Sequence, residues 1–200
     1  MDLLSDTKSE YDSLSFEALD YQGEEIVSKD FFDCSFTRCS FVETSFRNCR
    51  FSACTFTECD LSLVHIQDCS FTQTKFKRSN LMGINWTEAF WPKSGLGSSI
   101  DFYDCLLSHS TFIGLSLKGI NMTECVAKNV DLSEVNLCQA NCSGTDFADS
   151  RFAHTDLTGA DLTGATNYSI DAALNTLKKT RFSLPEAMSL LYSLDIILTE

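Results

Sequence analysis

The residues with the greatest chemical potential in this 200-residue chain are ten cysteines. Four of them lie within the stretch CSFVETSFRNCRFSACTFTECDLS (39–62). Thiols this close together are typical of a zinc site or a disulfide framework. Neither pattern is complete, because no CxxC pair occurs and the three histidines (His65, His109 and His154) are not at metal-ligand spacing with a cysteine. The sequence therefore predicts no metal and no cofactor.

The motifs of common enzymes are also missing. The chain contains no HExxH, no GxSxG and no glycine-rich phosphate loop. Paired carboxylates do occur, but the repeat pattern described next places them on a regular exposed surface, where nothing raises a carboxyl pKa for acid–base work. We therefore expect a protein that is not an enzyme.

Apolar residues, most of them large, recur at every fifth position, from Phe16 to Trp91 and again from Phe102 to Leu162. A second row, two residues before each of these core positions, holds small residues. Eight of the ten cysteines belong to this row: Cys34, Cys39, Cys49, Cys54, Cys59, Cys69, Cys105 and Cys125. Because a free thiol behaves as a small buried hydrophobe, these cysteines are interpreted as packing spacers.

A period of five matches neither a helix nor a simple strand. It fits a chain that turns a corner once per repeat, so that four sides close a coil of about 20 residues and successive coils stack about 4.8 Å apart. Phe36, Phe56 and Phe76 would then form one column. The pattern predicts an all-β solenoid whose core is a ladder of repeated side chains.

The segment TDLTGADLTGA (155–165) resembles the pentapeptide repeat family, whose repeat reads A(D/N)LXX. The resemblance implies a right-handed quadrilateral β-helix over residues 11–166. An N-terminal tail at 1–10 would precede it, and a C-terminal capping and dimerisation segment at 167–200 would follow.

The two apolar runs are out of register across WPKSGLGSSIDF (91–102), which holds the only cluster of Pro and Gly. We predict an insertion with a register shift at 92–100. It is either a tolerated bulge or a contact loop, since loops on rigid scaffolds often carry function. The contact residues would be Trp91, Pro92, Lys93, Ser94, Gly95 and Leu96.

The C-terminal segment departs from the repeat. Ser183 and Glu186 are spaced as a capping box, with Pro185 in the first turn, which predicts a short helix beginning near Leu184. Its apolar residues either cap the open end of the solenoid or pair with a second copy. We favour a homodimer, formed through Leu184, Ala187, Leu190, Leu191, Leu194 and Ile196.

The net charge of −13 disfavours direct binding to nucleic acid or to an anionic membrane, and indicates a basic partner or plain solubility. Residues 100–171 hold ten acids and three bases, whereas residues 30–92 hold seven acids and six bases. The repeat's own preference for Asp before a core residue explains single positions but explains this contrast less well. The candidate acidic face consists of Asp104, Glu124, Asp131, Glu134, Asp146, Asp149, Asp156 and Asp161.

The whole chain resembles the Qnr- and MfpA-like branch of the family, which protects DNA gyrase and topoisomerase IV from poisons. NWTEAFWP (85–92) and RFSLPEAMSLLYSLDI (181–196) are similar to the albicidin-resistance members. The resemblance implies a DNA mimic whose acidic face occupies the basic DNA saddle of gyrase, while the insertion contacts the toxin-sensitive region. The alternative is a structural scaffold with another protein partner. The chain has no signal peptide and no run of 18 apolar residues, so we expect a cytoplasmic protein without a membrane span.

Overall fold

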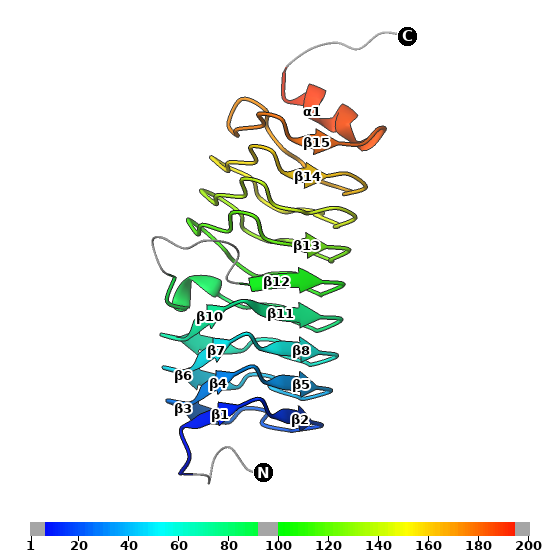
Figure 1. The fold of residues 1–200 in the computed structure, drawn as a ribbon. Coiled ribbons are helices and arrows are strands. Elements are labelled where there is room, and N and C mark those ends of the chain that lie inside the picture. Colours follow the sequence, from blue (N-terminus) through cyan, green and yellow to red (C-terminus); the bar gives the residue numbers. More distant parts are fainter. Residues whose placement is uncertain (1–6, 92–99, 195–200) are drawn as a thin grey trace.

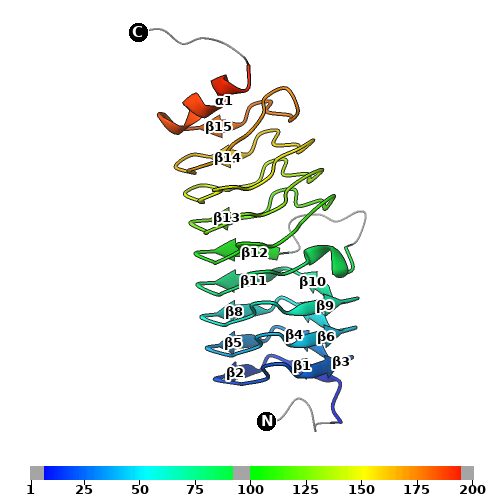
Figure 2. The same cartoon turned by 180° about the vertical axis from the view of Figure 1, so that it is seen from behind.

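The structure, a computed structural model, describes residues 7–91 and 100–194. The chain winds into a single stack of coils, with short strands lying directly above one another from the N-terminal end to a short C-terminal helix (Figure 1; Figure 2 from behind). Every strand pairing is parallel, and partners in the first coils are 20 residues apart, such as Phe16 with Phe36. The predicted all-β solenoid is confirmed.

Each coil has four faces, numbered here in chain order. The first face holds β1 (Glu10–Asp12), β4 (Asp30–Phe32), β7 (Arg50–Ser52) and β10 (Ser70–Thr72). The second holds β2 (Ser15–Glu17), β5 (Ser35–Thr37), β8 (Thr55–Thr57), β11 (Thr74–Lys77), β12 (Ile100–Tyr103) and β13 (Met122–Thr123), and then β14 (Asp161–Leu162) with β15 (Arg181–Phe182). The third is a column of single bridges from Asp20 to Thr166. The fourth holds β3 (Glu25–Val27), β6 (Ser45–Arg47) and β9 (His65–Gln67), followed by the 3-10 helix η1 (Trp86–Glu88).

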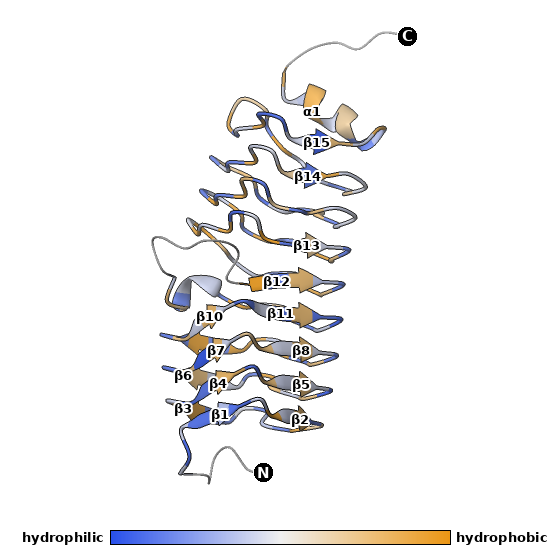
Figure 3. Cartoon of the chain, in the orientation of Figure 1, coloured by the Kyte–Doolittle hydropathy of each residue, from blue (hydrophilic) through white to orange (hydrophobic). Residues whose placement is uncertain are grey.

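The central residue of each five-residue side points into the coil. In each three-residue strand the middle residue is therefore buried, and the residues on either side of it are exposed or partly buried. Apolar residues consequently recur once per side along the whole stack (Figure 3). On the second face the Phe36 and Phe56 rings stack with centroids 4.5 Å apart and planes 6° apart. Each buried ring stabilises the fold by roughly 1.5–3 kcal/mol relative to an exposed one.

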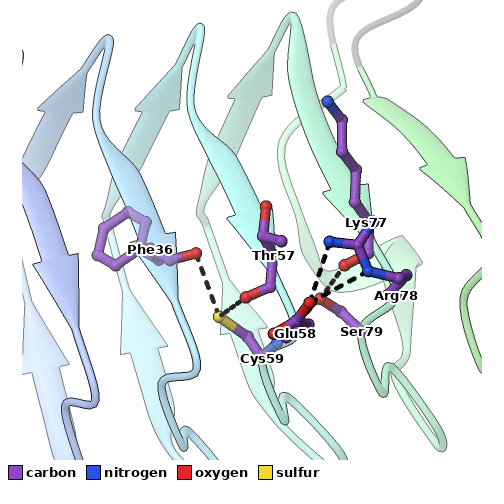
Figure 4. Close-up of polar contacts among 7 residues, drawn as sticks. All are labelled: Phe36, Thr57, Glu58, Cys59, Lys77, Arg78 and Ser79. Atoms are coloured by element: carbon purple, nitrogen blue, oxygen red, sulfur yellow. Dashed lines mark hydrogen bonds and ion pairs between the residues drawn. The ribbon is translucent and has the colours of Figure 1, made fainter.

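The row of small residues is buried as predicted, and all ten cysteines are free. The row also has a second role. The Cys59 thiol lies 3.4 Å from two backbone carbonyls, those of Phe36 and Thr57, and donates to them (Figure 4). Thr145 Oγ1 donates in the same way to the Met122 carbonyl, at 2.6 Å. Where Cys, Ser or Thr occupies the row, the side chain can thus donate a hydrogen bond to a backbone carbonyl, whereas Val64, Ala140 and Ala160 fill the same position by packing alone.

The step between coils lengthens across the insertion. Phe76 pairs with Phe102, 26 residues later instead of the usual 20. The Ile84 N–H donates to the Ser110 hydroxyl, which is also 26 residues later. Ile100 already belongs to β12, where it pairs with Thr74, so the strand begins inside the predicted range 92–100. Trp91 is partly buried and its indole N–H donates to the Trp86 carbonyl at 2.7 Å. Pro92, Lys93, Ser94, Gly95 and Leu96 lie outside the described residues.

The stack continues past residue 166, where the sequence period ends. Phe152 pairs with Ile170, so this coil is shorter than the others, but Asp156 pairs with Thr176 and β14 pairs with β15 in the ordinary register. The core residues Tyr168 and Ile170 are buried there without five-residue spacing. The predicted boundary at 166 is therefore too early, because a coil can close without keeping the strict repeat.

The C-terminal segment forms η2 (Glu186–Met188) and α1 (Ser189–Tyr192). The predicted capping box is wrong, because no side chain caps these helices. Ser183 Oγ instead accepts from the Gly164 N–H at 2.9 Å, and Glu186 Oε1 accepts from the Asn167 N–H at 2.6 Å. Both donors belong to the preceding coil, whose amides lack a further coil to pair with. The segment thus closes the open backbone edge of the stack.

Candidate functional site

The eight carboxylates predicted to form one acidic face fall into two structural groups. Asp131, Asp146, Asp156 and Asp161 each precede a core residue. In each, Oδ1 accepts the backbone N–H two residues later, at 2.9–3.1 Å. This contact is an Asx turn, in which the side chain helps the chain round a corner. These four carboxylates are therefore part of the fold.

The same four residues do not share a face. Asp156 lies on the first face, Asp161 on the second, Asp146 on the third and Asp131 on the fourth. Asp146 is also ion-paired with Lys128 at 3.1 Å, and Asp161 with Arg181. The prediction of one acidic face containing all eight residues is corrected on this point. Turn chemistry also accounts for part of the acidity of the second half.

Local contacts keep three of these turn carboxylates ionised. Burial raises the pKa of Asp146, but hydrogen bonds from Asn167 and Lys128 outweigh it, so that the pKa is lowered. Burial also raises the pKa of Asp161, but hydrogen bonds from Thr163 and Arg181 outweigh it, so that this pKa is lowered as well. The pKa of Asp156 is lowered chiefly by the side chain and N–H of Thr158.

The second group occupies the corners two residues after a core residue. Asp104, Glu124, Glu134 and Asp149 are all exposed and have left-handed backbone, with φ of 54°, 54°, 61° and 58°. Within residues 7–91 and 100–194, these four carboxylates make no ion pair and accept no side-chain hydrogen bond. They are therefore free to interact with a partner.

Three of the free carboxylates border the third face. Asp104 and Glu124 are 20 residues apart on its corner with the second face, and Asp149 lies on its corner with the fourth. The Glu124 carboxylate lies over Gly144, where a Cβ would collide with it, so the absent side chain makes room for the charge. Glu134 stands apart, on the corner between the fourth and first faces. We call Asp104, Glu124 and Asp149 the corner carboxylates of the third face.

The first half of the stack neutralises its charges between neighbouring coils. Its ion pairs join Arg38 to Glu17, Arg47 to Glu25 at 3.1 Å, Arg50 to Asp30 at 3.9 Å and Arg78 to Glu58 at 3.0 Å (Figure 4 for the last pair). Beyond residue 100 the described chain shows only the pairs of Asp146 and Asp161. The acidity expected there from the sequence is thus both denser and less compensated.

The predicted dimerisation residues divide between cap and surface. Leu190 packs against the core of the stack, and Ala187 and Leu191 are partly buried. Leu184 is 78% exposed and Leu194 is 48% exposed, while Ile196 lies outside the described residues. Sequence reasoning missed Met188 and Tyr192, which are also exposed. Met188 and Tyr192 are four residues apart within the helix expected from the sequence, and this spacing is the signal that could have found them.

Other kinds of site find no support in the part of the chain that the structure describes. No group of His, Cys, Asp or Glu side chains there is arranged to hold a metal ion. None of the helices described has the length and apolarity that crossing a bilayer requires.

Comparisons with known proteins agree with this architecture. A family model described as a pentapeptide repeat region matches residues 29–99, and a model of pentapeptide repeats in eight copies matches residues 100–137 and 128–166. A comparison with curated protein sequences gave no match.

Solved structures show the same fold at low sequence identity. A trypsin-treated variant of QnrB1, a plasmid-mediated fluoroquinolone resistance protein, is 18% identical, with a TM-score of 0.51 over 92% of this chain and 100% of that one. HetL from the cyanobacterium Nostoc sp. strain PCC 7120, a pentapeptide repeat protein involved in heterocyst differentiation regulation, is 16% identical, with a TM-score of 0.52 over 87% of each chain. The repeat matches and the four-sided coil together show that the chain belongs to the pentapeptide repeat family.

Proposed function

We propose that this chain is a DNA-mimicking protein that binds DNA gyrase, and by the same chemistry topoisomerase IV, and protects them from poisons of the albicidin or quinolone type. It acts in the cytoplasm and by binding alone, without catalysis. The observation that carries the proposal is the set of exposed, unpaired corner carboxylates of the third face, Asp104, Glu124 and Asp149. The fold that the chain shares with QnrB1, a fluoroquinolone resistance protein, supports the same reading.

The physical basis is the repeat of negative charge on a rigid rod. Coils place equivalent carboxylates about 4.8 Å apart along the stack, a regular spacing of the same order as the 3.4 Å of helix axis per phosphate on one DNA strand. Asp104 and Glu124 follow one another at this step. A like-charged pair is unfavourable in the isolated sheet, and a basic partner surface would relieve the repulsion on binding.

We also propose that two copies associate through their C-terminal segments. Four residues of the C-terminal segment, called here the C-terminal row, expose apolar side chains: Leu184, Met188, Tyr192 and Leu194. A two-fold dimer would bury this row and extend the acidic rod on both sides of the axis. The segment that starts at Trp91 would reach the poison-sensitive region of the enzyme.

A supercoiling assay tests the function. Purified protein is titrated into gyrase with relaxed plasmid, alone and with albicidin or ciprofloxacin. We expect inhibition of supercoiling at high protein concentration and recovery of supercoiling in the presence of at least one poison. If the protein neither inhibits gyrase nor relieves either poison, the function is wrong and a scaffold with another protein partner takes its place.

A further inference from the structure

The third face carries apolar side chains where its repeat calls for polar ones. The column that precedes its core residues reads Asp20, Ser40, Asp60, Asn80, Leu106, Val126, Asp146 and Thr166. Asp60, Asn80 and Asp146 accept the turn N–H two residues later, at 2.9, 3.2 and 3.1 Å. Leu106 and Val126 have no side-chain acceptor for this bond.

The apolar side chains here stay at the surface, since Val126 is only partly buried and Leu106 is exposed. Leu106 is 43% exposed, so its side chain contributes little to the core. Val126 has no side-chain oxygen to accept the turn N–H of Lys128. Ser108 Oγ accepts this N–H instead, at 3.3 Å. The turn has thus been repaired around an apolar residue, which indicates that the apolar surface itself is useful.

Two further apolar residues lie on the preceding coils at this face. Leu106 pairs directly with Val126. Met82 lies two residues after Asn80, the bridge partner of Leu106 on the preceding coil, so it is a diagonal neighbour of Leu106 at a distance that a long side chain can span. The Leu63 side chain extends over Gly83, where its Cδ2 lies 2.5 Å from the position a Cβ would take. We call Leu63, Met82, Leu106 and Val126 the apolar strip.

Acidic groups flank the apolar strip on both sides. Asp104 and Glu124 line its corner with the second face. At the opposite corner a surface hollow is lined by Glu43, Leu63, Val64, His65, Gly83, Asn85 and Glu88. Of the cations here, Lys128 is ion-paired with Asp146, and Arg78, which precedes Asp104 on the same corner, is ion-paired with Glu58 at 3.0 Å. A partner that covers Leu106 and Val126 therefore meets Asp104 and Glu124 along one edge. Where it extends to Leu63 it meets the hollow that contains Glu43 and, 3.9 Å from His65, Glu88.

We propose that the apolar strip docks a basic amphipathic α-helix of a protein partner, lying along the axis of the stack. Coils rise about 4.8 Å and a helix turn rises 5.4 Å, so one apolar side chain per helical turn can meet each coil over about three turns. Lys or Arg side chains beside the apolar row face Asp104 and Glu124 and reach the hollow at Glu43 and Glu88. A second copy of this chain fits poorly at the strip, because none of its described helices, η1, η2 and α1, contains a Lys or Arg that could face these carboxylates.

The inference goes beyond DNA mimicry, since duplex DNA presents no apolar row, and it does not depend on the partner being a topoisomerase. The probe is a synthetic 14-residue peptide of Leu and Lys with its leucines on one helical face. Its controls are a scrambled peptide of the same composition and a Leu/Glu peptide. Binding of each fluorescein-labelled peptide is measured by anisotropy at two salt concentrations.

The variants are matched pairs. Leu106→Ser with Val126→Thr alters the strip, and Val27→Thr with Ile113→Thr alters apolar residues of the fourth face that are each 44% exposed. We expect the patterned Leu/Lys peptide to bind at least tenfold more tightly than either control, and the strip variant to lose tenfold or more while the fourth-face variant stays near wild type. Equal affinity of the patterned and scrambled peptides, equal loss in both variants, or no binding would overturn the proposal.

A measurement on the unaltered protein keeps the test valid if the strip variant fails to fold. A photoreactive version of the patterned peptide is cross-linked to wild-type protein and the adducts are mapped by mass spectrometry. We expect adducts at the strip and its corners. Adducts spread over all four faces, or concentrated on another face, would contradict the proposed docking site.

Discussion

The Trp86 and Phe112 rings stack with centroids 5.7 Å apart and planes 8° apart, although the insertion separates them in the chain. Trp86 also meets Phe71, Phe76 and Phe102 edge-on, at 5.7, 5.8 and 5.3 Å. The aromatic core therefore passes through the register shift without a break. Such continuity holds the carboxylates of the second half in a fixed position relative to the first half, as a binding surface on a rigid rod requires.

Replacement of Trp86 tests this continuity. Trp86→Ala should lower the free energy of unfolding by about 3–5 kcal/mol, because the side chain is fully buried between the two halves. Trp86→Phe should cost much less, since it keeps a stacked ring and removes an indole N–H that has no hydrogen-bond partner. Urea unfolding followed by circular dichroism measures both variants. Similar losses for Phe and Ala would show that ring stacking at this site matters little.

The two groups of carboxylates should respond differently to substitution. Asp131→Ala removes the acceptor of the Ser133 N–H and should cost about 0.5–1.5 kcal/mol, whereas Asp131→Asn keeps an acceptor and should cost less. Glu134→Gln, only three residues away, should change stability by no more than about 0.5 kcal/mol, because its side chain is exposed and unpaired. Thermal unfolding of the three variants tests the distinction. A larger loss for Glu134→Gln than for Asp131→Ala would reverse the assignment.

The stability of the stack should fall in acid. The pKa values of Asp146, Asp156 and Asp161 are lowered on folding, so each ionised group stabilises the folded state above the unfolded-state pKa, roughly 3.9. This contribution is lost as the pH falls through the folded-state pKa values. Urea midpoints between pH 7 and pH 3 should therefore decrease below about pH 4. Asp156→Asn should reduce the slope in this range, and an unchanged slope in that variant would exclude a role for Asp156.

Much of the architecture could be predicted because one rule repeats. The five-residue period depends only on which side chains enter the coil, and Phe36 above Phe56 follows from it directly. The roles of Ser183 and Glu186 could not be read this way, because their partners, Gly164 and Asn167, lie in the preceding coil. A local motif and a contact between coils compete for the same side chains, and only the folded stack shows which prevails.

The acidic residues illustrate a second limit. Asp131 and Asp149 look alike in the sequence, since both are aspartates of the second half, but one forms a turn and the other points outward from a left-handed corner. The difference depends on the position of each aspartate relative to the nearest core residue, which the five-residue period predicts. It also depends on the turn geometry of the coil, which the period does not predict. Which free carboxylates share an edge follows from the 20-residue coil, which places Asp104 and Glu124 on one corner and Asp149 on another.

The C-terminal row gives a prediction on assembly. Leu184→Asp with Tyr192→Asp should yield monomers with nearly unchanged stability, because both side chains are exposed. Leu190→Asp should instead destabilise the cap, since Leu190 packs against the core. Light scattering and thermal unfolding separate the two effects. A double variant that scatters as wild type would mean that the exposed row does not form the interface between copies.

Competition with DNA tests the central proposal most directly. Labelled duplex DNA is bound to purified gyrase, and its displacement is measured with wild-type protein, with Asp104→Asn plus Glu124→Gln, and with a control variant, Asp33→Asn plus Asp68→Asn. The control removes two charges from exposed left-handed corners of the first half. We predict displacement by wild type and by the control, and at least tenfold weaker displacement by the Asp104 and Glu124 variant. No displacement by wild type, or equal displacement by all three, would contradict DNA mimicry by these carboxylates.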